Sequence, residues 1–84
     1  MNPDQTYKFT VYSFSLGDVE DPEIYVAGPL FEWQQTEKGK WVMDNAIEKP
    51  TFYIDSDPYT WGYRVNVQAI FDEKNATFYS LKYK

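Results

Sequence analysis

The sequence predicts a single α+β domain, residues 1–84, in which an antiparallel sheet of about four strands carries its helices packed on one face. Two observations predict this class. Apolar and polar residues alternate from Tyr63 to Phe71, as in a strand with one buried face. An acidic stretch with a proline, 18–23, is typical of a helix start. The remaining segments complete the order β-α(α)-β-β-β.

The first strand is predicted from Tyr7 to Leu16. Its apolar side chains follow one phase up to Val11 and the other phase from Tyr12 onward. Either a β-bulge near Val11 or a strand in the centre of the sheet, buried on both faces, would explain this change. We favour the central strand.

The helical region is predicted to begin with Asp21 as the N-cap, Pro22 at the first helical position and Glu23 in the first turn. Helical spacing continues to about Ile47, but Gly28-Pro29 interrupts it, because proline lacks an amide donor. One kinked helix fits this pattern. Two helices, of which Pro29 opens the second, fit it equally.

The helical region is predicted to finish with a helix from Glu37 to Ala46, with Thr36 as its N-cap. A short strand follows from Thr51 to Asp55. Residues 55–62 are rich in turn formers and predict an Asx-type turn between two strands.

The last two strands are predicted to form a β-hairpin, 61–71 and 76–83, joined by the polar run 72–75. One face of this hairpin is apolar and packs on the core. The opposite face of the sheet is then open to water or to a partner.

Several kinds of chemistry are excluded by composition, because the chain has no cysteine and no histidine. Disulfide scaffolds, thiol catalysis, zinc fingers and Ser-His triads are not available to a monomer. The carboxylates of 18–23, Asp55 and Asp57 lack the ligand order of a calcium loop. We therefore expect no metal, no cofactor and no enzymatic activity.

The formal charge of −5, with Arg64 as the one arginine, disfavours binding to duplex nucleic acid. The sequence shows no signal peptide and no apolar run that would span a bilayer. We expect a soluble, cytoplasmic protein without a membrane partner.

The aromatic content is high, with eight Tyr, six Phe and three Trp. A domain of this size cannot bury all of them, so we expect some on a contact surface. Aromatic side chains beside proline and glycine in the predicted loop either fold over the edge of the core or face a partner. The predicted partner-binding residues are Tyr59, Trp61, Tyr63, Arg64 and Tyr79.

Three segments, Glu32 to Met43, Trp61 to Tyr63 and Ala76 to Tyr83, resemble a group of small uncharacterised proteins encoded by tailed bacteriophages. The resemblance covers about half of the chain and carries no functional residues with it. It implies a phage product that acts in the cytoplasm of the bacterial host or is built into the virion.

The favoured function is a non-enzymatic protein-binding module, a phage effector or inhibitor that binds a host protein, or alternatively a phage protein, through an aromatic-rich surface. DNA mimicry is a weaker variant, because the sequence shows no dense acidic stripe. The alternative is a structural or accessory subunit of a phage particle, held by an edge strand that could also form a homo-oligomer.

A lesser alternative is binding of single-stranded nucleic acid on the open sheet face. Aromatic rings would stack on the bases, and two cations would contact phosphates. The candidate stacking residues are Tyr12, Phe14, Tyr53 and Tyr79, and the candidate phosphate contacts are Arg64 and Lys82.

Overall fold

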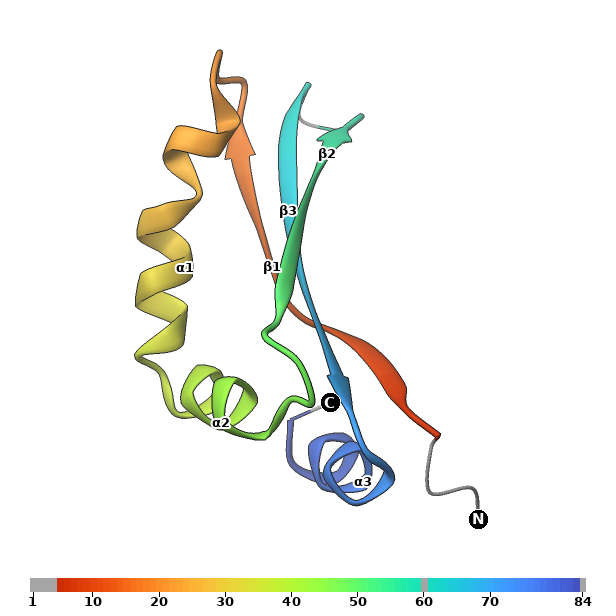
Figure 1. The fold of residues 1–84 in the computed structure, drawn as a ribbon. Helices are drawn as coiled ribbons and strands as arrows, with labels where there is room; N and C mark the ends of the chain where they lie inside the picture. Colours follow the sequence, from red (N-terminus) through yellow and green to blue (C-terminus); the bar gives the residue numbers. More distant parts are fainter. Residues whose placement is uncertain (1–4, 60, 84) are drawn as a thin grey trace.

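The computed structural model describes residues 5–59 and 61–83, which form an α+β domain as predicted. Within these residues, three antiparallel strands make one sheet, and three α-helices and a short 3₁₀ helix accompany it (Figure 1). The elements are β1 (Tyr7–Gly17), η1 (Pro22–Tyr25), α1 (Ala27–Gln34), α2 (Glu37–Asn45), β2 (Thr51–Asp57), β3 (Gly62–Phe71) and α3 (Glu73–Lys82).

β3 is the central strand, with β1 on one side and β2 on the other. Its side chains alternate between a buried face toward the helices and a face toward solvent, which we call the open face. The alternation predicted for this segment is confirmed. Val65, Val67, Ala69 and Phe71 are buried, whereas Arg64, Asn66, Gln68 and Ile70 lie on the open face.

β1 is an edge strand, so the predicted position in the sheet centre is wrong. Its pairing with β3 shifts register between Thr10 and Tyr12, and Val11 is the extra residue of a β-bulge. Because of this residue, Phe9 and Tyr12 both oppose buried residues of β3 and both pack against the core. The change of phase in the sequence therefore reports the bulge.

The predicted C-terminal strand is wrong, because residues 73–82 form α3. Asp72 is the N-cap of this helix, and its Oδ1 accepts a hydrogen bond from the backbone N–H of Asn75 at 2.8 Å. Ala76 and Tyr79 lie on one face of α3 and are buried in the core. The hairpin of this fold is therefore the one that β2 and β3 form.

Two separate helices, not one kinked helix, precede the α1–α2 connection. η1 begins at Pro22, but the Asp21 side chain makes no capping hydrogen bond. α1 begins at Ala27, so Pro29 lies in its first turn, where a backbone N–H has no intrahelical acceptor. The boundary is at Val26, two residues before the predicted one.

Thr36 separates α1 from α2 and caps α2, as predicted. Its Oγ1 accepts a hydrogen bond from the Gly39 N–H at 3.0 Å and donates one to the Trp33 carbonyl at 2.6 Å. Gly39 lies so close to that carbonyl that any side chain would collide with it. The connection between the two helices is therefore held in one conformation.

The core lies at the end of the molecule where α2 and α3 pack beneath the sheet (Figure 1). The domain is elongated, 45 × 25 × 20 Å, because the ten and eleven residues of β3 and β1 extend past this core. The opposite end carries the β2–β3 turn and the connection from β1 to η1. The core residues are Val11, Trp33, Val42, Val67, Ala69, Phe71, Ala76 and Tyr79.

Candidate partner-binding surface

The β2–β3 turn brings together four of the five predicted partner-binding residues. We define the hairpin tip as Asp57–Tyr59 and Trp61–Arg64. Tyr59 and Trp61 are 92% and 86% exposed, which makes them the most exposed large hydrophobic side chains of the described residues. Tyr63 is half-buried and Arg64 is exposed at the start of β3.

The fifth residue, Tyr79, lies in the core and not at the hairpin tip. It is 3% exposed, and its ring centroid lies 5.0 Å from that of Phe9 and 5.6 Å from that of Phe71. The interpretation of Tyr79 as a contact residue depended on a C-terminal strand, which is a helix. We therefore leave Tyr79 out of the candidate surface.

Asp57 holds the turn in shape. Its Oδ1 accepts a hydrogen bond from the Tyr59 N–H at 3.0 Å, the arrangement of the predicted Asx-type turn. The residue is 8% exposed and is the one buried charged side chain of the described residues. A buried carboxylate is thus fixed within the turn that carries the two exposed rings.

A contact between two glycines fixes the hairpin tip against the end of β1. A Cβ on Gly62 would collide with the backbone of Gly17. Gly17 itself has φ +78°, which a residue with a side chain rarely adopts. The turn and the connection from β1 to η1 therefore lie against each other, and Asp18 is brought next to the hairpin tip.

Trp61 has a strained backbone. Its φ of +58° is in the left-handed region, and Trp61 is the one residue other than glycine with positive φ in the described chain. A conformation of this kind costs on the order of 1 kcal/mol for a residue with a Cβ. The surrounding turn must therefore hold it in place.

Two pockets lie beside the hairpin tip. The Trp61 pocket has a volume of about 310 Å³ and is lined by Asp18, Ser56, Asp57, Pro58, Trp61, Gly62 and Tyr63. The Arg64 pocket has a volume of about 560 Å³ and is lined by Ser15, Asp55, Ser56, Asp57, Pro58, Tyr59, Arg64 and Asn66. Asp57 lines both pockets.

The net charge of the described chain is concentrated at this end. Segments 18–23 and 55–64 carry six carboxylates and one cation, Arg64, whereas the other described residues carry six carboxylates and six lysines. The acidic run 18–23 was visible in the sequence. The position of Asp18 beside Asp57 was not, because it depends on the register that pairs Gly17 with Tyr63.

No family model, curated protein or solved structure matches this chain. The resemblance to proteins of tailed bacteriophages therefore stays a prediction. The geometry and charge of the hairpin tip are the basis on which a function can be argued.

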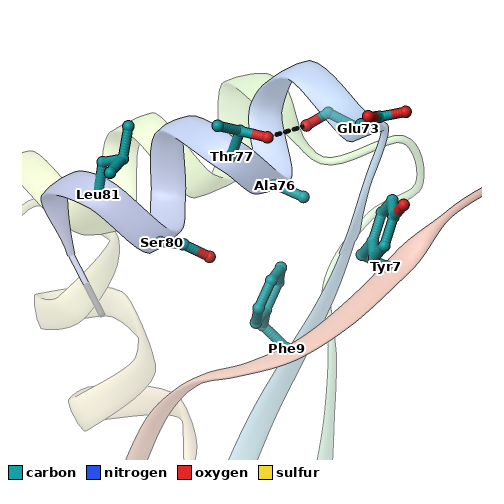
Figure 2. A pocket seen from close by; sticks show the side chains of 7 residues that line it. All are labelled: Tyr7, Phe9, Glu73, Ala76, Thr77, Ser80 and Leu81. Carbon is teal, nitrogen blue, oxygen red and sulfur yellow. Dashed lines mark hydrogen bonds between the residues drawn. The ribbon is translucent and has the colours of Figure 1, made fainter.

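A third pocket, at the core end, has a different character. It lies between β1 and α3, with a volume of about 310 Å³, and Tyr7 and Phe9 point from β1 toward the helix (Figure 2). Thr77 Oγ1 donates a hydrogen bond to the Glu73 carbonyl at 2.9 Å, so its hydroxyl is used within the helix. No set of charged groups converges there as it does at the hairpin tip.

The residues predicted to bind single-stranded nucleic acid are not brought together. Tyr12 packs against the core on the helix side of the sheet, and Lys82 lies in α3 at the core end. Tyr53, opposite Asn66, and Arg64 share the open face with acidic Asp55.

Neither a cluster of metal-ligating side chains nor a membrane-spanning helix is found within residues 5–59 and 61–83. No group of three or more His, Cys, Asp or Glu side chains is placed to hold a metal ion in this part of the chain. No helix among these residues is long and apolar enough to cross a membrane.

Proposed function

We propose that the protein is a non-enzymatic protein-binding module that contacts its partner through the hairpin tip. The main support for this proposal is the exposure and the backbone conformation of Trp61. Its side chain is 86% exposed, and its backbone has a φ of +58°.

Folding alone does not explain a tryptophan at this position. The left-handed conformation costs on the order of 1 kcal/mol, and an exposed indole gains little from burial to offset that cost. Glycine or asparagine would relieve the backbone. A large aromatic side chain kept in a strained, exposed turn is typical of a contact residue.

Tyr59 and Trp61 are side chains of the type that dominates binding energies. Large aromatic residues bury ~150–250 Å² each, so the pair would supply about half of the roughly 800 Å² that one partner buries in a standard interface. The Asp57 hydrogen bond and the contact between Gly17 and Gly62 order the turn beforehand. Binding would therefore lose little conformational entropy.

The experiment that tests this proposal is capture of a partner from bacterial lysate, because the resemblance to phage proteins implies a product that acts in the bacterial cytoplasm. Tagged wild type is compared with Trp61→Asn and with Leu81→Asn, which removes an 83% exposed side chain from α3 at the core end. We expect one stoichiometric partner with wild type and Leu81→Asn, lost with Trp61→Asn. A partner that Trp61→Asn retains, or an empty capture at low salt, would contradict the proposal.

A second candidate function is that of a particle subunit held by the outer edge of β2. Among the described residues β2 pairs with β3 alone, and it contains no lysine, proline or bulge that would protect the edge. Phe52 and Tyr53 are 45% and 47% exposed there. Sedimentation at high concentration should then show self-association that Phe52→Lys abolishes, and a strict monomer would exclude this function.

A further inference from the structure

We infer that the partner surface recognised by the hairpin tip is basic, and that an arginine side chain of the partner enters the Trp61 pocket. This inference rests on the proposed function and adds the chemistry of the partner. It is carried by the charge around the hairpin tip, by the lining of the Trp61 pocket and by the positions of the chain's own cations.

The charge around the hairpin tip selects for a basic partner. Segments 18–23 and 55–64 hold six carboxylates against one cation. Their combined field accelerates encounter with a positive surface and repels a negative one, over a distance of about 8 Å at physiological salt. Because the rest of the described chain is balanced in charge, this field also orients the approach toward the tip.

The Trp61 pocket combines the two kinds of group that bind a guanidinium. Trp61 and Tyr63 supply aromatic rings, on which a planar cation stacks. Asp18 and Asp57 supply carboxylates, which accept paired hydrogen bonds from the fork of an arginine. The lysine ammonium has neither the plane nor the fork, so arginine fits this lining better.

The cations of residues 5–59 and 61–83 do not supply a guanidinium or ammonium group to the Trp61 pocket. Arg64 Nη1 donates a hydrogen bond to Ser15 Oγ at 3.3 Å and lines the other pocket. At the core end, Lys38 Nζ lies 5.3 Å from the ring centroid of Tyr79, and Lys82 Nζ lies 5.3 Å from that of Tyr83. Among the described residues, the rings of the hairpin tip have no such cation, and a partner would provide it.

The test is a nuclear magnetic resonance titration that follows the indole N–H signals of the three tryptophans. The signal missing from Trp61→Asn identifies Trp61. The probe is an acetylated and amidated peptide of alternating arginine and glycine, ten residues long. Two matched peptides carry lysine or neutral citrulline in place of arginine.

The expected result is a saturable shift of the Trp61 signal with the arginine peptide, weaker with lysine and absent with citrulline. Equal shifts with arginine and citrulline would overturn the inference while leaving protein binding at the tip intact. No shift with any peptide would also overturn it, and the lysate capture with Trp61→Asn would then decide on the proposed function separately.

Two variants link the shift to the carboxylates. Asp57→Asn keeps an oxygen that accepts from the Tyr59 N–H but removes the charge, and Asp18→Asn removes the second charge. We expect the double variant to bind the arginine peptide about tenfold more weakly. Asp44→Asn, an exposed carboxylate of α2, is the matched control and should leave the affinity unchanged. Equal weakening by the control would mean that overall charge alone drives binding, which overturns the pocket.

Discussion

The two ends of the molecule use aromatic side chains in opposite ways. At the core end, rings from α2, α3 and β3 contact one another: Trp41 lies 5.1 Å from Phe78 and 5.3 Å from Phe71 between centroids. At the hairpin tip, Tyr59 and Trp61 are 92% and 86% exposed. The difference shows that the high aromatic content serves stability at one end and is available for contact at the other.

The largest effect should come from removing a ring at the core end. Phe71→Ala deletes a side chain with 0% exposure and leaves a cavity, so we expect the free energy of unfolding to fall by about 3–5 kcal/mol. Urea unfolding measures this change. The matched variant at the tip, Tyr59→Ala, should stay within about 0.5 kcal/mol of wild type. Similar losses of unfolding free energy in both variants would contradict the proposed difference between the two ends.

The next effect concerns the glycine that attaches the hairpin tip to β1. Gly62→Ala places a methyl group against the Gly17 backbone, so we expect a loss of about 1–3 kcal/mol and a displaced turn. Gly28→Ala is the control, because nothing lies within 4 Å of its added Cβ, and it should stabilise α1 by up to about 1 kcal/mol. Thermal unfolding of both variants checks the two signs. A harmless Gly62→Ala would show that the tip is not held by this contact.

A smaller effect on stability is expected when the backbone strain at Trp61 is relieved. Asparagine tolerates the left-handed region, so Trp61→Asn should match wild type in stability or exceed it by up to about 1 kcal/mol. Trp61→Ala keeps the unfavourable conformation and should show no such gain. Chemical denaturation of the two variants provides the measurement. A loss of more than 1 kcal/mol in both would mean that the indole stabilises the edge of the core, the other outcome that the sequence left open.

The smallest effect is a pH dependence at the core end. Lys82 Nζ donates a hydrogen bond to Glu37 Oε1 at 3.1 Å, which raises the pKa of the lysine above its usual 10.5. A raised pKa in the folded state adds stability at and below the usual lysine pKa, and this stability is lost as the pH rises through the folded value. Glu37→Gln should therefore be slightly less stable than wild type at pH 8, and the two should converge above pH ~11. A difference that persists at high pH would point to a contact other than the charge.

The parts of the fold that depend on local chemistry could be predicted from the sequence. The alternation of β3 and the cap at Thr36 are decided by neighbours a few residues away. For the C-terminal segment the sequence predicts a strand where the structure has a helix, because its residues fit the periods of both. Tyr79 and Tyr83 are four residues apart, so they lie on the same face of either a strand or a helix. The N-cap at Asp72 favours the helix.

For the candidate surface, the sequence predicts the turn but not the grouping of carboxylates around it. Proline, glycine and Asp57 predict the turn. The sequence leaves open whether Tyr59 and Trp61 fold over the core or face solvent, and the structure shows both exposed. The proximity of Asp18 and Asp57 depends on sheet order and register, which arise from contacts between residues far apart in the sequence. The bulge at Val11 also depends on contacts between distant residues, because it arises in the pairing of β1 with β3.

The placement of the three indoles gives the protein a built-in optical readout. Trp33 is 5% exposed and stacks on Tyr12, Trp41 lies among other rings, and Trp61 is open to water. Emission from the first two should be blue-shifted and shielded from a dissolved quencher such as acrylamide, whereas Trp61 should emit at longer wavelength and be quenched first. A single spectrum can therefore report occupancy of the hairpin tip at its red edge and the integrity of the core at its blue edge.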